Sequence, residues 1–287
     1  MCIRDSGNTT IQLITTNEAY KNLNVSIYVG NGTAEYPFYI RSYQDLSAIS
    51  EDNASGMTLS AHYQQVADID MSVANSVWNP IGTGSTAGFT GSYNGNNHVI
   101  SNLELMQEGS VFADENTVYV DGTVENAGLF ARVGNGGVVS RLTISNAIID
   151  GNFVSAGAVA GVVNGGQINF VNVVDSVISS KYTATPVIGG IAGKLVGTNY
   201  NARIQYSAVV NSTISVGTAG EIGGLVGEAT GAYINNSYAI VSFATDSGSN
   251  PIIGGIVGLL ANGSGNTAAS TSTKLSLIHI SEPTRPY

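Results

Sequence analysis

Ile222-Gly-Gly-Leu-Val-Gly227 is the stretch of sequence that decides the fold, because copies of it recur along the chain. Two close copies and three weaker ones are present. The close copies are Ile188-Gly-Gly-Ile-Ala-Gly193 and Ile253-Gly-Gly-Ile-Val-Gly258, and the weaker ones are Gly157-Ala-Val-Ala-Gly161, Ala127-Gly-Leu-Phe-Ala131 and Ala87-Gly-Phe-Thr-Gly91. Self-similarity at a regular spacing indicates a repeat architecture in which each copy is one supersecondary unit.

The central apolar residues of the copies set the period. They are Phe89, Leu129, Val159, Ile191, Leu225 and Ile256, at intervals of 40, 30, 32, 34 and 31 residues. A second signature follows each copy, with an apolar residue, two further residues, and then an apolar residue or serine. Its copies are Ile100-Ser-Asn-Leu103, Val139-Ser-Arg-Leu142, Ile168-Asn-Phe-Val171, Ile204-Gln-Tyr-Ser207 and Ile234-Asn-Asn-Ser237.

A third apolar stretch comes after the second signature, at residues 147–149, 177–178, 213–214 and 241–243. The short alternating patterns rich in Val, Ile and Tyr favour strands. Three strands and three corners make one turn of a β-helix. The sequence therefore predicts an all-β protein, a parallel β-helix (β-solenoid) of about five to six turns with an N-terminal cap.

The glycines of the repeat fit this architecture. When turns stack at about 4.8 Å, equivalent inward side chains form a ladder, and glycine allows tight corners with positive φ and close approach of the backbone. The residues expected to build the repeat are Gly91, Leu129, Gly161, Gly190, Gly193, Gly224, Gly227, Gly255 and Gly258. A β-sandwich or propeller with glycine-rich hairpins is the alternative, but it should show longer alternating strands and Asn-Gly turns.

The motif resembles that of the GLUG family, named for its Gly-Leu-hydrophobic-Gly signature. The resemblance covers residues 36–263 and is most specific in the last three copies, whereas Thr90 and Ala131 depart from the pattern. GLUG repeats occur in bacterial adhesins of the filamentous-haemagglutinin kind and in β-helical parts of some immunoglobulin-A-cleaving peptidases. The resemblance implies an extracellular solenoid and identifies no ligand.

The two ends of the chain are related at the DNA level. Residues 1–6, MCIRDS, back-translate to ATG TGT ATA AGA GAC AG, whose reverse complement encodes Leu-Ser-Leu-Ile-His-Ile, the sequence of residues 275–280. This relation is typical of a translated sequencing adapter. We therefore predict that residues 1–6 and 275–287 are adapter-derived and exclude them from the fold.

Four further segments are predicted between these ends. Residues 7–35 are interpreted as the remnant of a preceding β-domain or a linker. Residues 36–86 are the expected cap, in which Ser42-Tyr-Gln-Asp45 can begin a short helix that carries Leu46 and Ile49. Residues 87–263 hold the repeats. Residues 264–274 are a linker or a truncated turn, because no Ile-Asn-x-Ser strand follows the last motif, and an uncapped turn should be prone to edge association.

Composition excludes several classes of protein. The net charge is −10 and charged residues make up only 10% of the chain, which argues against binding of nucleic acid or anionic lipid. The one cysteine, Cys2, lies in the predicted adapter, so thiol chemistry is not expected. The mean hydropathy is +0.14, but the longest apolar run, residues 252–261, is about half of the ~20 residues of a membrane helix. No membrane insertion is expected within this chain.

Histidines and paired aspartates are the first candidate site residues. Asp68 and Asp70 are spaced to share one face of a strand and are a candidate carboxylate pair or calcium site, although a turn or cap role is the favoured interpretation. His62 and His98 are isolated, without a His-Glu-x-x-His motif. We predict no metal and no cofactor.

Catalytic carboxylates in polysaccharide-processing β-helices gather on one side of consecutive turns. Here the acidic residues fall at different phases of the repeat, so no catalytic residue is predicted. They are Asp150, Asp175, Glu221, Glu228 and Asp246, with Lys181, Lys194 and Arg203 as the nearby cations. Tyrosines cluster in the later turns as candidate sugar-binding surfaces or, the preferred interpretation, ordinary solenoid walls. They are Tyr182, Tyr200, Tyr206, Tyr233 and Tyr238.

Two functions remain. The first is a non-catalytic extracellular repeat domain of a bacterial surface protein, acting as a stalk or in adhesion, with a host surface, a glycan or a protein as partner. The alternative is the non-catalytic β-helical portion of a large secreted peptidase or glycan-processing enzyme. Both predict the same fold, so the rest of the gene discriminates between them, either through further repeats and an anchor or through a catalytic motif.

Overall fold

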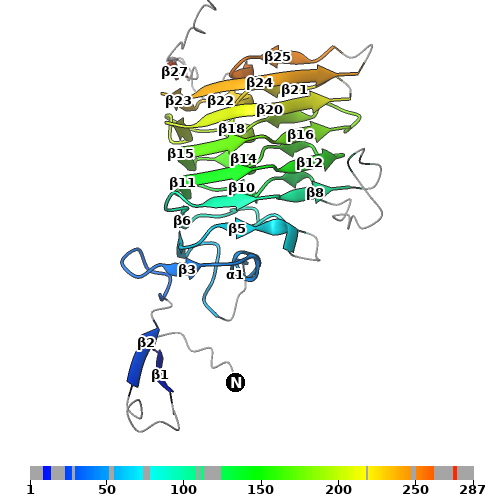
Figure 1. The fold of residues 1–287 in the computed structure, drawn as a ribbon. Coiled ribbons are helices and arrows are strands. Elements are labelled where there is room, and N and C mark those ends of the chain that lie inside the picture. The colour runs from blue at the N-terminus through cyan, green and yellow to red at the C-terminus, as the bar shows by residue number, and fades with distance from the viewer. Residues whose placement is uncertain are drawn as a thin grey trace, which may run out of the picture.

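The fold is that of a parallel β-solenoid of about six turns, as predicted (Figure 1). A computed structural model describes residues 30–51, 55–73, 78–107, 110, 112, 124–217, 219–246 and 250–261, and the backbone of residues 9–13, 23–27 and 274–276. The pairings between the described strands of the solenoid are all parallel. The predicted adapter segment 1–6, and most of the segments 7–35, 264–274 and 275–287, lie outside the described residues.

The solenoid has three walls. Wall 1 is a 15-stranded sheet that bends at its corners, and walls 2 and 3 have five strands each. Wall 1 contains β3 (Phe38–Ile40), β4 (His62–Gln65), β5 (Ile69–Asp70), β6 (Ser92–Asn94), β7 (Val99–Ser101), β8 (Glu104–Met106), β11 (Val138–Ser145), β12 (Ile148–Gly151), β15 (Gln167–Val174), β16 (Val177–Ser180), β19 (Arg203–Gln205), β20 (Ala208–Val216), β23 (Tyr233–Asn235), β24 (Tyr238–Thr245) and β27 (Lys274–Ser276).

Walls 2 and 3 follow one another closely along the chain. Wall 2 contains β9 (Asn126–Ala127), β13 (Ser155–Ala156), β17 (Val187–Gly189), β21 (Glu221–Gly223) and β25 (Ile252–Gly254). Wall 3 contains β10 (Phe130–Val133), β14 (Ala160–Asn164), β18 (Ala192–Val196), β22 (Val226–Thr230) and β26 (Val257–Ala261). We number the turns so that turn 1 begins at β4, turn 2 at β6, turn 3 at β11, turn 4 at β15, turn 5 at β19 and turn 6 at β23.

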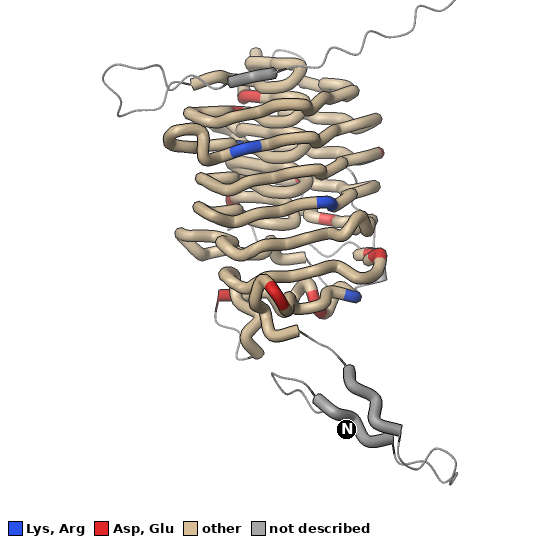
Figure 2. Tube along the Cα trace, turned by 90° about the vertical axis from the view of Figure 1, so that its left-hand side faces the viewer, with Lys and Arg blue, Asp and Glu red and all other residues tan. Residues whose placement is uncertain are grey.

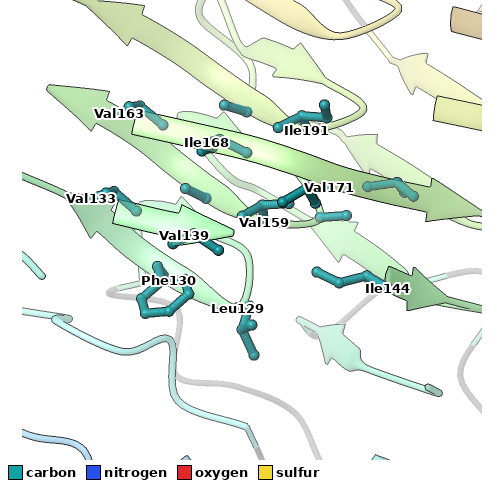
Figure 3. Close-up of a cluster of buried hydrophobic side chains, with 14 of the residues drawn as sticks. Leu129, Phe130, Val133, Val139, Ile144, Val159, Val163, Ile168, Val171 and Ile191 are labelled. Carbon is teal, nitrogen blue, oxygen red and sulfur yellow. The ribbon is translucent and has the colours of Figure 1, made fainter. Parts of the chain in front are cut away.

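The repeat motif forms the corner between walls 2 and 3, and its central apolar residues form an interior ladder. The wall 3 strands pair so that Ala160, Ala192, Val226 and Val257 lie in register. The preceding residues therefore stack in line: Leu129, Val159, Ile191, Leu225 and Ile256 (Figure 3 shows the first three with their neighbours). The first four are fully buried and Ile256 is partly buried, which confirms the predicted ladder for these five.

The prediction that Phe89 begins this ladder is wrong. Phe89 bridges Val133, whereas Ile81 bridges Phe130, so Pro80 occupies the position below Leu129. Gly91 likewise lies elsewhere in the turn. It precedes Ser92, which pairs with Val138, and so it is in line with Gly137. An apolar residue beside glycine occurs at more than one corner of a turn, and for this reason the pattern alone did not fix the phase of the weakest copy.

The second signature was also misplaced in its first copy. Ile100 pairs with Ile144, and the residue in line with Val139 is Tyr93. In turns 3 to 5, wall 1 therefore contains this signature twice, five residues apart, at two successive corners. Non-glycine residues with positive φ mark both corners. At the first corner they are Arg141, Phe170, Tyr206 and Asn236, and at the second Asn102, Asn146, Asp175 and Asn211.

The motif glycines work through close packing. Positive φ was expected at these glycines, but only Gly88 and Gly128, in the two copies nearest the N-terminus, have it, and the other positive-φ residues lie at the wall 1 corners and in other turns. A Cβ on Gly193 would lie 2.1 Å from Ser155 Oγ, and one on Gly224 would lie 2.1 Å from Gly255 O and 2.5 Å from Ala239 Cβ. In turns 4 and 5 the chain thus passes from wall 2 to wall 3 at a corner too tight for a side chain at Gly193 or Gly224, whereas Ala131 and Ala158 occupy the equivalent positions in turns 2 and 3.

A cap covers the first turn. The helix α1 (Tyr43–Ser47) begins as predicted, because the Ser42 side chain accepts a hydrogen bond from Asp45 N at 3.3 Å. Leu46 is fully buried and Ile49 nearly so. The short helix η2 (Met71–Val73) follows β5, and the hairpin of β1 (Thr9–Leu13) and β2 (Leu23–Ile27) pairs antiparallel. No described helix has the length and apolarity needed to cross a membrane.

The last turn lacks such a cover among the described residues. Ile253 is 49% exposed, although Ile222, its partner in turn 5, is fully buried. Leu260 is 53% exposed above the fully buried Ala229. No strand was expected after the last motif, but β27 does follow it and pairs in parallel with β23. Walls 2 and 3 still end at β25 and β26.

Two glycines in equivalent positions give a matched test of this packing. We expect Gly224→Ala to lower the free energy of unfolding by about 1–3 kcal/mol, because its Cβ would overlap Gly255 O. Gly255→Ala should be nearly neutral, because no atom of the described residues lies within 4 Å of its Cβ position. Denaturant unfolding of both variants checks this. An equal loss in Gly255→Ala would show that another element covers the last turn.

The open end also predicts self-association. Because the cap covers turn 1 and turn 6 exposes apolar side chains and strand edges, the chain should pair end to end as a dimer instead of growing into fibres. Light scattering over a concentration series should detect the dimer, and Ile253→Ser with Leu260→Ser should weaken it. Tyr36→Ser, at the capped end and 41% exposed, is the control. Unchanged association in the double variant would contradict the prediction.

Candidate functional site

Buried serines close the corners of wall 1. At the second corner, Ser212 Oγ accepts from Ser176 N at 3.1 Å and donates to Val210 O at 3.0 Å. At the first corner, Ser237 Oγ accepts from Ser207 N at 3.1 Å in the same way. Each hydroxyl thus satisfies a backbone N–H of the adjacent turn that would otherwise be buried without a partner. These serines explain why the second signature ends in serine in the later turns.

Asp68 and Asp70 bind groups of the next turn. Asp68 Oδ1 accepts from Val99 N at 2.9 Å and lies 3.0 Å from His98 Nδ1, and Asp70 Oδ1 accepts from Asn102 Nδ2 at 2.8 Å. The hydrogen bond from Val99 N lowers the pKa of Asp68, and that from Asn102 lowers the pKa of Asp70. These bonds favour the turn interpretation.

The structure does not bring the histidines together in a metal site. His62 Nδ1 lies 2.6 Å from Ser92 Oγ, and His98 is held by Asp68. Across the described ranges, no group of three or more His, Cys, Asp or Glu side chains is placed to hold a metal ion. The absence of a metal and of a cofactor stays a prediction for the whole chain.

Asp150 and Lys181 form an ion pair between turns 3 and 4. The distance from Lys181 Nζ to Asp150 Oδ2 is 3.5 Å; the Asp150 side chain is fully buried and that of Lys181 is 39% exposed. Ser179 and Ser215 occupy the equivalent position of Asp150 in the next two turns. A buried carboxylate at a serine position therefore depends on its lysine.

A second charged group lies at the corner of walls 2 and 3. Lys194 and Glu228 are in register, with Nζ and Oε2 3.4 Å apart. Burial and the nearby Glu228 charge raise the pKa of Glu221, and Lys194 opposes them. Glu221 and Glu228 lie at different phases of the repeat, as expected, but the tight corner brings their charges close enough to interact. Asp150 and Asp175 lie on wall 1, away from this group.

The tyrosine cluster divides between corners. Tyr182 follows β16 at the far end of wall 1, whereas Tyr233 lies in register with Arg203 and Tyr200 O accepts from Arg203 Nε at 2.9 Å. Tyr206 stacks on Phe170, with ring centroids 4.8 Å apart and planes 5° apart. Sequence reasoning missed Phe170, since only the register of β15 and β19 reveals that residues 36 apart are neighbours.

The Phe170–Tyr206 stack is exposed and conformationally costly. The two side chains are 51% and 49% exposed, and both residues have positive φ. Positive φ costs most residues roughly 1–2 kcal/mol but is tolerated by Asn. Stacking of two aromatic rings stabilises the fold by about 0.5–1.5 kcal/mol, which offsets part of this cost. Asn236 occupies the same corner in turn 6, which shows that this position also accepts a residue for which positive φ costs little free energy.

The fold and these groups define the chain as a parallel β-solenoid whose polar residues mostly support its corners. It matches no model of a known protein family. Over 131 residues it is 36% identical to Halomucin from Haloquadratum walsbyi, an alignment that covers 43% of this chain and 1% of Halomucin. The chain thus spans only a small fraction of that relative.

A solved structure shares the fold. It is that of a candidate immunoglobulin A1 protease from Bacteroides ovatus, with a TM-score of 0.51 and 19% sequence identity. The likeness covers 78% of this chain and 66% of the other. At this level of identity it concerns the fold alone.

The ion pair of turns 3 and 4 yields a stability prediction. Lys181→Met should lower the free energy of unfolding by about 1–2 kcal/mol, less than the 3–5 kcal/mol of a fully buried pair, because Lys181 is partly exposed. Adding Asp150→Ser should restore most of the lost stability, because serine already occupies this position in the next two turns. A double-mutant cycle by thermal unfolding measures this. An equal cost of Lys181→Met in both backgrounds would show that the pair contributes nothing.

Proposed function

We propose that this chain is a non-catalytic repeat segment of an extracellular surface protein, which serves as a stalk and offers its walls for adhesion. The observation that carries the proposal is the uniform stacking of turns 3 to 6, in which turns 3 to 5 bury their apolar residues between a neighbouring turn on each side. Such a stack can be lengthened by adding turns without changing the existing ones. The likeness to a stretch that is 1% of Halomucin supports a place in a long protein.

We propose further that the protein is bacterial and that its repeats belong to the GLUG group. The supporting feature is the Ile-Gly-Gly-x-x-Gly corner of walls 2 and 3, which recurs at Ile188, Ile222 and Ile253. Parallel β-solenoids with few charges and many exposed polar side chains are typical of surface and secreted proteins. A host surface, a glycan or a protein is the proposed partner class, without membrane insertion or nucleic acid.

The second candidate is the non-catalytic β-helical portion of a large secreted peptidase or glycan-processing enzyme. The fold likeness to the candidate immunoglobulin A1 protease favours it. In that case the chemistry belongs to another part of the protein. Purified chain incubated with human immunoglobulin A1 should leave the heavy chain intact under either proposal, as judged by gel electrophoresis. Cleavage would overturn both, because the chain itself would then be a peptidase.

The genomic locus decides between the two proposals. Sequencing the original DNA across the junctions near Ser6 and Lys274 should show a reading frame that continues into further repeats, with a signal peptide or an anchor. A peptidase motif in the continuing frame would favour the second candidate. A native stop codon directly after Tyr287 would contradict the adapter prediction for residues 275–287.

A further inference from the structure

We propose that the Phe170–Tyr206 stack on wall 1 is a binding site for the sugar rings of a neutral polysaccharide. This inference rests on the proposed surface role and names the ligand class and the place of binding. The stack joins turns 4 and 5 at the first corner of wall 1, with Phe170 inside β15 and Tyr206 directly after β19.

The first argument is the choice of residue. Both aromatic residues occupy a backbone conformation that bulky side chains rarely adopt, while Asn236 fills the equivalent place in turn 6 at little cost. Strained positions that persist on a surface indicate function more often than stability. Each ring covers one face of the other, and about half of each side chain remains exposed.

The second argument is the row of neutral amides directly before the rings. Directly before the corner, Asn169, Gln205 and Asn235 lie in register, one amide in each of three successive turns. The Oδ1 atoms of Asn169 and Asn235 are buried and have no hydrogen-bond partner among the described residues. Both side chains are only partly buried, so rotation of the amide can bring the oxygen to the surface, where it would accept hydrogen bonds from hydroxyl groups. Their spacing of about 4.8 Å is close to the length of one residue of an extended polysaccharide.

The third argument excludes other ligands. Lys, Arg, Asp and Glu are few along the stacked turns (Figure 2), and the chain carries a net charge of −10. The net negative charge of the chain repels nucleic acid and acidic polysaccharides, and Arg141 is the one cation among the four residues of this corner row, Arg141, Phe170, Tyr206 and Asn236. A peptide cannot add as a strand here, because β15 and β19 are paired on both sides. Sugar rings present apolar C–H faces to an aromatic ring and hydroxyl groups to amides, which this surface satisfies.

The test uses variants that suit the backbone. Phe170→Asn and Tyr206→Asn place at each corner the residue that turn 6 already has, so the fold should be retained. Arg141→Asn, at the same corner in turn 3, is the matched control. The full chain and its variants are run in native affinity gels that contain laminarin, mannan, xylan or dextran, with alginate as the anionic comparison. Thermal unfolding by circular dichroism is measured in parallel.

We expect retardation of the wild-type chain in at least one neutral gel, retention of binding by Arg141→Asn, and a loss of about tenfold or more in the Phe170→Asn/Tyr206→Asn variant. The melting temperature of that variant should stay the same or rise. Absence of retardation in every neutral gel, retardation by alginate alone, or equal retardation of the double variant would overturn the proposal. If no binding is seen in the gels but sequencing of the locus finds further repeats and an anchor, the sugar-binding proposal fails and the proposed stalk function stands.

Discussion

Parallel pairing of each turn with the next is the constraint on which the rest of this structure depends. Because equivalent residues of neighbouring turns lie one strand spacing apart, a side chain inside the solenoid must pack directly on its counterpart. The ladder from Leu129 to Ile256 follows from this requirement. So do the serines, whose hydroxyls satisfy the backbone of the adjacent turn at corners where the strand pairing is interrupted.

The same constraint explains why glycines are found at one kind of corner and residues with positive φ at another. Motif glycines are needed where walls 2 and 3 meet, because a side chain there would overlap the backbone of a neighbouring strand. The corners of wall 1 instead turn with positive φ and point their side chains outward, where any residue fits sterically at some conformational cost. Outward corners can thus vary between turns, and this freedom explains how Phe170 and Tyr206 occur beside Arg141 and Asn236.

The two ends of the solenoid differ for a related reason. In turn 1 the equivalent strands are short, and large side chains fill the interior in place of a regular ladder. Tyr63, Phe89 and Phe130 form a row, with ring centroids 6.1 and 4.9 Å apart. The helix α1 then covers this end. Turn 6 keeps the regular repeat pattern and exposes it, since a ladder residue is buried only when turns lie on both sides.

The sequence by itself determined the class of fold, the period and the short cap helix, because these follow from apolar patterning, glycine spacing and capping residues that act locally. It also indicated which residues would stack in turns 2 to 6. It did not determine the phase of the weak copies at Phe89 and Ile100, since similar patterns occur at several corners. Only the tertiary structure decided that Phe170 meets Tyr206 and that Glu221 meets Glu228. Such contacts depend on the register between turns and on the tightness of one corner, and neither is encoded in a local pattern.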